Sequence, residues 1–156
     1  MSNQPAIPFS TTLYVKDTCL CLHAQRAARA LARRFDTALK VLGLTNQQFS
    51  LMMSLNRPEP PSMAPVASLL AMDRTTLTAA LKPLTKRDWV TVEADPKDRR
   101  GKRLKLTETG MAVLSAALPI WADTHQQVEA ELASGDPDTL RRDLLALGAP
   151  HLVPAG

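Results

Sequence analysis

The sequence predicts a mainly α-helical domain with one small β-hairpin, and three features support this fold class. Apolar residues make up 45% of the 156 residues but aromatic residues only 4%, so the core must be built from aliphatic side chains, which suit helices better than sheets. Over long stretches the apolar residues recur at spacings of three and four, as on one face of a helix. One pair of short segments, 89–93 and 102–106, has the pattern of paired strands.

The N-terminal part is expected to contain an arm and one long helix. Residues 1–16 include Pro5 and Pro8 and few helix-forming residues, so we expect an extended arm there. Residues 17–42 follow a helical period and precede Gly43, a residue type that commonly ends a helix. The apolar positions of this helix are Leu20, Ala24, Ala27, Leu31, Phe35, Ala38 and Leu42.

Three shorter helices are predicted next, each preceded by a residue whose side chain can accept a hydrogen bond from the first helical turn. Thr45 precedes a helix that ends before the proline-rich loop 58–61. Ser62 precedes a short third helix, and Asp73 precedes a fourth. Pro83 lies well inside this fourth helix, where it removes one backbone hydrogen bond and should kink the helix or end it early.

The hairpin and two further helices complete the chain. Residues 94–101 form a charged turn between the two strands. Thr107 is expected to cap a fifth, long helix that runs to about residue 133. The Asp-Pro pair at 136–137 marks the start of a sixth helix, which should end at Gly148.

The positive charge of the chain is concentrated in residues 74–105. This window holds ten Lys and Arg against four Asp and Glu, a net charge of +6, whereas the whole chain has a formal net charge of +4. The remaining residues are therefore slightly acidic. Such a concentration of charge is expected of a surface that meets phosphate. A solvated basic face without a partner is the alternative.

The order of short helix, tight turn, helix and basic hairpin is that of a winged helix-turn-helix. The fourth helix has the two faces that a recognition helix needs, because its apolar side would hold it to the domain while its polar side entered the major groove of DNA. Taken singly, each feature also fits a core helix beside a solvated turn, but their order favours the DNA-binding fold. The apolar side comprises Leu77, Leu81 and Leu84, and the polar side Thr75, Thr78, Lys82 and Lys86.

Several motifs resemble those of MarR-type transcriptional regulators. Leu44–Phe49 is similar to the helix opening that follows the dimerisation helix in that family, and Met72–Thr78 is similar to the start of its recognition helix. The most specific motif is Asp95–Arg100 followed by Leu104–Gly110, which resembles the family's wing, where an Asp-x-Arg turn precedes a strand ending in Leu-Thr-x-x-Gly. Ala79 departs from the pattern, since many relatives carry an Arg there.

The resemblance implies a homodimer that binds a pseudo-palindromic site on double-stranded DNA, most often as a repressor, with an activator as the near alternative. By the same resemblance, Asp98 corresponds to the acid that orients the wing arginine, and Arg100 to that arginine. The expected segments are an N-terminal arm (1–16), a dimerisation helix (17–44), a winged helix-turn-helix domain (45–106), C-terminal dimerisation helices (107–148) and a tail (149–156). The residues expected at DNA are Arg74, Thr75, Thr76, Thr78, Lys82, Lys86, Lys97, Asp98, Arg99, Arg100 and Lys102.

Relatives in this family leave DNA in response to small molecules or to oxidants, and the chain has candidates for both. A small aromatic or carboxylate effector is expected between the dimerisation helices and the winged domain. His23 and Arg26 lie one turn apart on the first helix, and Arg26 could hold a carboxylate by two parallel hydrogen bonds. Surface or interface positions are the alternative for both. Phe49, Met52 and Met53 could supply the apolar wall, while Trp121 and His125 are assigned only a structural role.

Cys19 and Cys21 are the candidates for oxidant sensing. The segment Leu20–Leu22 resembles the position of the reactive cysteine in the peroxide-sensing OhrR branch, but Asn46 and Phe49 stand where that branch has tyrosines. Two cysteines two positions apart on one helix point in nearly opposite directions, so they are not expected to pair. The alternative is two small apolar residues in a dimer interface. A soft metal at these thiols has less support, since no further Cys or His completes a site.

Other classes of protein have less support. The sequence has no glycine-rich phosphate loop, no paired-histidine metal motif and no Gly-x-Ser-x-Gly turn, so we expect no enzyme, no cofactor and no metal site. A Cys21 nucleophile would need His125 or His151 as a base. No apolar run approaches the roughly 18 residues of a membrane span and no secretory signal is visible, which indicates a cytoplasmic protein. A protein-interaction module whose basic hairpin binds an acidic partner is the remaining alternative.

Overall fold

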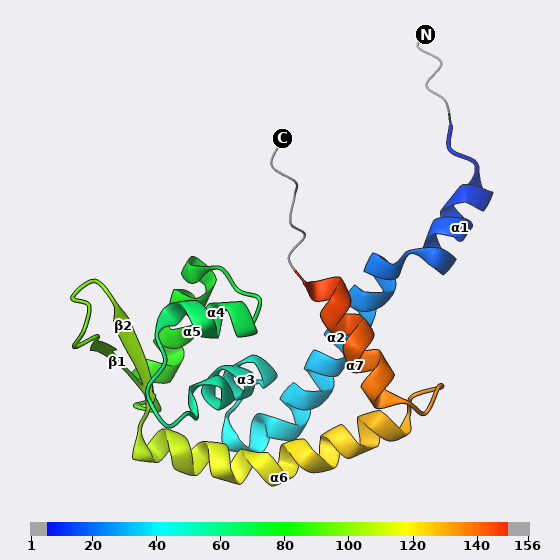
Figure 1. The fold of residues 1–156 in the computed structure, drawn as a ribbon. Coiled ribbons are helices and arrows are strands. Elements are labelled where there is room, and N and C mark those ends of the chain that lie inside the picture. The colour runs from blue at the N-terminus through cyan, green and yellow to red at the C-terminus, as the bar shows by residue number, and fades with distance from the viewer. Residues whose placement is uncertain (1–5, 150–156) are drawn as a thin grey trace, which may run out of the picture. The chain divides into compact units, whose positions relative to one another are not determined.

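The computed structural model describes residues 6–149. This part of the chain holds seven α-helices, one short 3-10 helix and one antiparallel hairpin (Figure 1), so the predicted fold class is confirmed. The chain forms two compact units that divide between Arg34 and Phe35. The first five residues of the predicted arm, the end of the predicted tail and His151 lie outside the described residues.

The first helix, α1 (Phe9–Thr18), replaces part of the expected extended arm. That expectation is wrong for residues 9–16. Pro8 occupies the position just before the helix (φ −61°, ψ 144°), where its missing N–H costs little and its fixed φ is compatible with a helix start. None of the side chains of α1 is buried, and Phe9 and Tyr14 are largely exposed.

The second helix, α2 (Leu20–Leu39), is shorter than the predicted span of residues 17–42. Cys19 adopts an extended conformation (φ −69°, ψ 107°) and separates α1 from α2, so a single helix from residue 17 is wrong. At the other end, the chain tightens into the 3-10 helix η1 (Lys40–Leu42) and stops at Gly43. The φ of Gly43 is 66°, in the left-handed region that glycine adopts without strain, which confirms the predicted stop.

The helix α3 (Asn46–Leu55) opens the second unit's helical cluster with a reciprocal cap. Thr45 Oγ1 accepts a hydrogen bond from the Gln48 N–H at 3.2 Å, and Gln48 Oε1 accepts one from the Thr45 N–H at 3.1 Å. Asp36 fixes the same turn, because its Oδ1 accepts from both the backbone and the side-chain N–H of Asn46 at 2.7 Å. The predicted cap is therefore confirmed and is reinforced from the preceding helix.

Two helices joined by a tight turn follow, α4 (Met63–Leu69) and α5 (Arg74–Lys86). Asp73 caps α5 as predicted, since its Oδ1 accepts from the Thr76 N–H at 2.7 Å. The expected early end of α5 is wrong, because the helix continues beyond Pro83 to its last residue. Pro83 is exposed, so water can satisfy the carbonyl that this proline leaves without a backbone donor.

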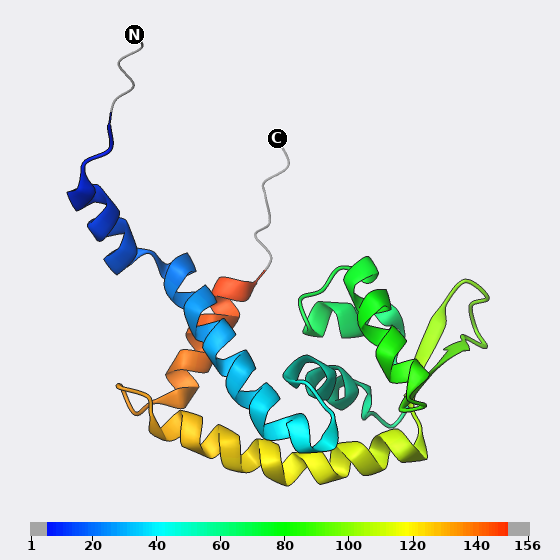
Figure 2. The same ribbon diagram turned by 180° about the vertical axis from the view of Figure 1, so that it is seen from behind.

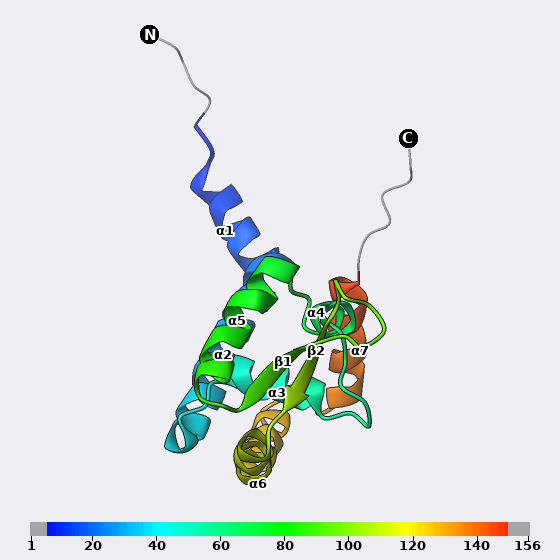
Figure 3. The same cartoon turned by 90° about the vertical axis from the view of Figure 1, so that its left-hand side faces the viewer.

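The hairpin consists of β1 (Val90–Ala94) and β2 (Lys102–Leu106), which pair in an antiparallel register. The free edge of β2 meets the loop before α4, where the Leu104 N–H donates to the Pro61 carbonyl at 2.9 Å and Ser62 forms a further bridge to the strand. Figure 3 shows α5 and the hairpin side by side. The hairpin is thus held both to α5 and to the proline-rich loop.

The chain then enters α6 (Glu108–Ala130) and turns back into α7 (Pro137–Gly148), as Figure 2 shows from behind. Thr107 caps α6 as predicted, with its Oγ1 accepting from the Gly110 N–H at 2.9 Å. Gly110 lies so close to the Trp89 carbonyl that any side chain there would overlap it. Among residues 6–149, no helix combines the length and the hydropathy of a membrane-spanning segment.

The core of the second unit lies between α3, α4, α5, α6 and the hairpin. The three leucines of α5 are buried in it, as the spacing predicted. Most of the core is aliphatic, in keeping with the low aromatic content of the chain. Its buried members are Leu39, Leu44, Phe49, Leu51, Met52, Leu55, Val66, Leu77, Leu81, Leu84, Trp89, Val90, Leu104, Leu114 and Ala117.

Candidate nucleic-acid interface

One face of α5 is fixed in the core and the other is open to solvent. Asp73 is committed to the cap of this helix: hydrogen bonds from the backbone N–H of Thr76, and then from its side chain, hold the pKa of the Asp73 carboxyl below its usual value. Thr78 Oγ1 donates to the Arg74 carbonyl at 2.8 Å, so Thr78 can offer a base only its methyl group and oxygen lone pairs. The predicted DNA contacts that α5 exposes are Arg74, Thr75, Thr76, Thr78, Lys82 and Lys86.

Three cationic side chains surround one hollow between α5 and the hairpin. Arg74 and Lys82 reach it from the helix and Lys102 from β2, so the fold brings together predicted contacts that are far apart in the sequence. Cations from two directions around a hollow on the surface suit the phosphate backbone of a nucleic acid. The hollow has a volume of about 250 Å³ and is lined by Met63, Arg74, Thr78, Leu81, Lys82, Thr85, Val92 and Lys102.

The tip of the wing exposes Lys97, Arg99 and Arg100. Asp98 orders this tip in a different way from the one the resemblance implied. Its Oδ1 accepts a hydrogen bond from the backbone N–H of Arg100 at 3.0 Å, whereas no ion pair joins the two side chains within the described wing. The reason is the short span of the turn, in which an aspartate side chain reaches the backbone N–H two residues further on. Asp98 therefore fixes the backbone that carries Arg100.

The start of the wing tip is held to β2 by an ion pair that was not predicted from the sequence. Arg103 Nε lies 2.9 Å from Asp95 Oδ2, and the side chain of Asp95 is only 8% exposed. Arg103 Nη1 also donates to the Pro60 carbonyl at 3.1 Å. The Lys97 N–H, and then the charge and hydrogen bond of Arg103, lower the pKa of the Asp95 carboxyl. Asp95 opens the motif recognised from the sequence, but Arg103 lies between its two segments, and only the folded hairpin shows that the two side chains pair.

Comparison with known proteins agrees with this geometry. The family model described as MarR family matches residues 44–102, the helical cluster and most of the hairpin. The M. tuberculosis transcriptional regulator MosR, solved in complex with DNA, is 38% identical, with a TM-score of 0.76 over 83% of this chain and 93% of that one.

The chain belongs to the MarR family.

Two further relatives of this MarR-family chain are more distant. The HTH-type transcriptional regulator SarZ of Staphylococcus aureus is 28% identical over 96 residues, which cover 62% of this chain and 65%, just under two thirds, of SarZ. The transcriptional repressor CouR, solved on a 23-mer DNA duplex, is 26% identical with a TM-score of 0.76 over 86% of this chain and 97% of that one. In the MarR-family chain, α4 and α5 form the helix-turn-helix and β1–β2 the wing.

The MarR-family fold also forms an apolar cavity that receives part of the predicted effector set. Phe49 and Met53 line it, but Met52 does not, because it is fully buried in the core. The prediction for Met52 is wrong because its side chain points into the core and is 0% exposed, whereas the side chain of Met53 is 37% exposed. The cavity has a volume of about 390 Å³ and is lined by Phe49, Ser50, Met53, Ser54, Leu69, Leu70, Leu118 and Trp121.

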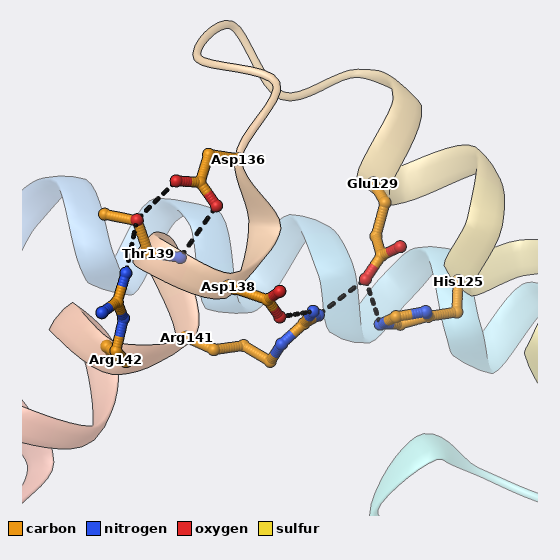
Figure 4. A network of polar contacts seen from close by, with 7 residues as sticks. All are labelled: His125, Glu129, Asp136, Asp138, Thr139, Arg141 and Arg142. Carbon is orange, nitrogen blue, oxygen red and sulfur yellow. Dashed lines mark hydrogen bonds and ion pairs between the residues drawn. The ribbon is translucent and has the colours of Figure 1, made fainter.

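Trp121 connects this cavity to a series of stacked aromatic rings and ion pairs along α6. Its ring stacks with that of Phe49, with centroids 6.0 Å apart, and with that of His125, 4.7 Å apart. His125 Nε2 lies 3.6 Å from Glu129, which also binds Arg141 of α7 at 2.6 Å. Figure 4 shows the His125 ring and the Arg141 guanidinium meeting at Glu129. Trp121 therefore belongs to the cavity wall, a role that its sequence position did not reveal.

The N-terminal unit carries the two cysteines. Cys19 is half-buried, and its Sγ accepts from the Leu22 N–H at 3.4 Å, as a capping residue does. Cys21 is exposed, and its Sγ accepts from Gln25 Nε2 at 3.2 Å. Because Cys19 lies outside α2, the argument that both thiols point apart on one helix does not apply. The sequence-based reason against their pairing is therefore wrong, although both thiols are free in the structure.

The remaining members of the predicted effector set lie on α2 in the same unit. His23 and Arg26 are exposed. His23 Nδ1 lies 2.7 Å from the Cys19 carbonyl and donates to it in the tautomer that carries the proton there. This bond uses one nitrogen of the imidazole and leaves the other for a second partner.

Proposed function

We propose that this chain is a dimeric DNA-binding transcriptional regulator, acting as a repressor on a pseudo-palindromic operator, and that a small effector releases it. One observation carries the DNA-binding part: the exposed Thr and Lys face of α5 and the cation of β2 surround one hollow beside the wing. A helix held by its apolar face, with phosphate-binding cations at its flank, suits insertion into a major groove. The relatives with bound DNA support the same assignment.

The dimer is supported by apolar side chains that the chain leaves uncovered. Leu140, Leu144 and Leu147 recur at helical spacing on α7, and all three are exposed. Apolar residues at this spacing usually cover another helix. A second copy of the chain is the partner that we propose, since a two-fold dimer also presents two recognition helices to the two halves of a palindrome.

Binding to a duplex from upstream of its own gene tests the proposal. We expect anisotropy titrations to show an affinity that falls about a thousandfold between about 50 and 200 mM salt, because several phosphates release their counterions. Lys82→Ala should reduce the slope of log affinity against log salt by about one, whereas Arg142→Ala on α7 should leave it unchanged. Salt-independent or absent DNA binding would instead favour a protein-interaction module that binds acidic partners.

A small aromatic compound is the effector class that the cavity supports, because none of its eight lining residues is charged. Arg26 is the candidate that would add a carboxylate contact. Naphthalene-2-carboxylate and its primary amide are matched probes that differ in charge, and Trp121→Phe is the control for fluorescence quenching. Tight binding of the carboxylate that is lost in Arg26→Ala supports a carboxylate effector. Equal binding of the amide in both proteins supports a neutral aromatic one.

A thiol switch is the second candidate function, and the exposure of Cys21 favours it. The Cys21 thiolate would attack a peroxide oxygen, forming an S–O bond while the O–O bond breaks and an alcohol leaves. The Cys19 thiol could then attack the sulfenic sulfur, forming an S–S bond and releasing water. Peroxide should release wild-type chain from DNA but not Cys21→Ser. Mass spectrometry then distinguishes the sulfenic acid, which has gained one oxygen, from the disulfide, which has lost two hydrogens. Cys19→Ser should show only the sulfenic acid.

A further inference from the structure

The turn between α5 and β1 contacts more parts of the second unit than its sequence suggests. It consists of Arg87, Asp88 and Trp89, directly after the recognition helix. Asp88 has a φ of 56°, a left-handed conformation that a residue other than glycine adopts at some cost. The Trp89 N–H donates to the Leu84 carbonyl at 3.0 Å and so ties the turn to the end of α5. A strained turn persists where surrounding contacts hold it, and here these contacts come from two directions.

Arg87 makes the contact on one side. Its Nη1 donates to the Gly43 carbonyl at 2.5 Å, across 44 positions of sequence. Its guanidinium carbon lies 4.7 Å from the centre of the Trp89 ring, so the planar group is held between a carbonyl and an aromatic face. Gly43 ends η1, which continues directly from α2. Arg87 therefore connects the end of the recognition helix to the segment that enters α3.

The start of α6 makes the contact on the other side. Thr107 Oγ1 donates to the Asp88 carbonyl at 2.6 Å, and the Thr107 N–H donates to the Trp89 carbonyl at 3.1 Å. Gly110 packs directly against the same carbonyl and leaves no room for a side chain. The last residues after α5 are thus bound to α6 by three close contacts. This end of α5 cannot turn without moving either α6 or the turn at Gly43.

We infer that Arg87 is a positioning residue that fixes the direction of the recognition helix relative to α6 and η1, and that it thereby sets which spacing of operator half-sites the dimer accepts. This inference rests on the proposed function. One added base pair turns a half-site by roughly 34° about the DNA axis, so a dimer with rigidly held recognition helices rejects it. Loosening the Arg87 contact lets each α5 tilt and accept neighbouring spacings. The side chain need not touch DNA to have this effect.

The test compares duplexes that differ only in half-site spacing. A randomised duplex library selected with the wild-type chain supplies the half-site, and synthetic duplexes then lengthen or shorten the interval by one or two base pairs. We expect wild-type affinity to fall at least tenfold for each changed spacing. Arg87→Ala should bind the changed spacings within about threefold of the original one, with the same preferred half-site sequence. Arg87→Lys, which keeps the charge but loses the planar stack, should fall between the two.

Lys82→Ala is the matched control, since it removes a cation from the hollow and should weaken all spacings equally. If Arg87→Ala behaves like Lys82→Ala, and Arg87→Lys restores full affinity, Arg87 is a phosphate contact and the inference is overturned. An unchanged spacing profile with unchanged affinity also overturns it. Thermal unfolding of each variant checks that the folded state is retained.

A measurement without DNA separates this inference from the proposed function. The distance between two spin labels reports the orientation of the recognition helix directly. The labels are attached at Lys82→Cys on α5 and Ala122→Cys on α6, in a chain that also carries Cys19→Ser and Cys21→Ser. Dilution with unlabelled chain leaves only distances within one copy. Arg87→Ala should broaden the distance distribution, and an unchanged distribution refutes the positioning role. A wild-type chain that binds no DNA refutes the proposed function and the effect on spacing, while the distance measurement still decides what Arg87 holds.

Discussion

Arg103 of β2 and Asp95, the first residue after β1, form an ion pair where the wing tip begins, with Arg103 Nε 2.9 Å from Asp95 Oδ2. The same guanidinium donates to the Pro60 carbonyl, so one side chain joins β2 to the start of the wing tip and to the loop before α4. The cationic residues at the tip are exposed, and the contact of Arg103 with the buried Asp95 fixes the backbone from which the tip extends. The wing is therefore ordered before it meets any partner.

Asp95→Asn should remove part of the acid sensitivity of the wing. The folded protein lowers the pKa of Asp95 below its ordinary value of 3.8, so the ionised carboxylate stabilises the fold above that value. This stabilisation is lost as the pH falls through the lowered pKa. In denaturant titrations between about pH 5 and pH 2, the stability difference between wild type and Asp95→Asn should shrink towards zero. A difference that stays constant over this range would contradict the assignment.

Arg100→Ala should weaken DNA binding by roughly 1–3 kcal/mol if the side chain enters a groove. Its melting temperature should stay at the wild-type value, because the backbone N–H of Arg100, which Asp98 holds, is still present. Arg103→Ala is the informative comparison: it should weaken DNA binding and also speed amide exchange in β2. Anisotropy titrations and hydrogen exchange distinguish the two variants. Equal exchange rates in both would mean that Arg103 does not order the wing.

Thr75→Ala and Lys86→Ala should affect DNA binding in different ways: the first should change sequence preference and the second overall affinity. Thr75 lies on the exposed face near the start of α5, where a side chain can reach base edges, and its loss should change which sequence is preferred. Lys86 lies at the end of the helix, and its loss should weaken all sequences alike. Selection from a randomised duplex library measures both effects. If the two variants gave the same selected sequence and the same affinity loss, the orientation of α5 on DNA would be wrong.

Met52→Ala and Met53→Ala should separate stability from ligand binding. Met52 is 0% exposed, and truncating it should cost about 2–5 kcal/mol of unfolding free energy. Met53 is 37% exposed in the cavity wall, so its truncation should cost about 1 kcal/mol or less and weaken binding of the naphthalene probes. Denaturant unfolding and fluorescence titration measure the two effects. A stable Met52→Ala chain would show that the core repacks around the gap.

Gly110→Ala should destabilise the chain by about 3 kcal/mol, because the added methyl group overlaps the Trp89 carbonyl at the point where two backbones meet. Gly148→Ala is the matched control, since nothing lies within 4 Å of a Cβ at that position. Calorimetry should find the control at or above wild-type stability. A Gly110→Ala chain as stable as the control would mean that α6 and the α5–β1 turn lie further apart.

Local signals predicted most helix starts of the second unit, although Ser62 accepts no side-chain hydrogen bond at the start of α4. The caps Thr45, Asp73 and Thr107 each act over three residues, so the sequence around them contains the whole interaction. The buried face of α5 was equally predictable, since a repeated spacing of leucines defines it. The break at Cys19 was not, because an extended residue between two helical patterns has no sequence signature of its own.

Contacts across long separations account for most of the candidate site that the sequence did not reveal. The Arg87 bond to Gly43 spans 44 positions, and the hairpin register decides that Arg103 meets Asp95. Met52 and Met53 both fit an apolar wall in a linear pattern, and only the packed helix shows which one is in the core. The residues of α5 that we propose to face DNA were predicted from periodicity, whereas the contacts that orient α5 became apparent only in the fold.

The helix α1 has ten residues and buries no side chain, which has a consequence for measurements in solution. Isolated helices of this length are marginal in water, so α1 has little stability of its own. Its apolar residues Phe9 and Leu13 are exposed, and we expect the second copy of the proposed dimer to cover them. The far-ultraviolet ellipticity of this protein should therefore rise with its concentration, so that a spectrum normally used to count helical residues also measures how much of the chain is assembled.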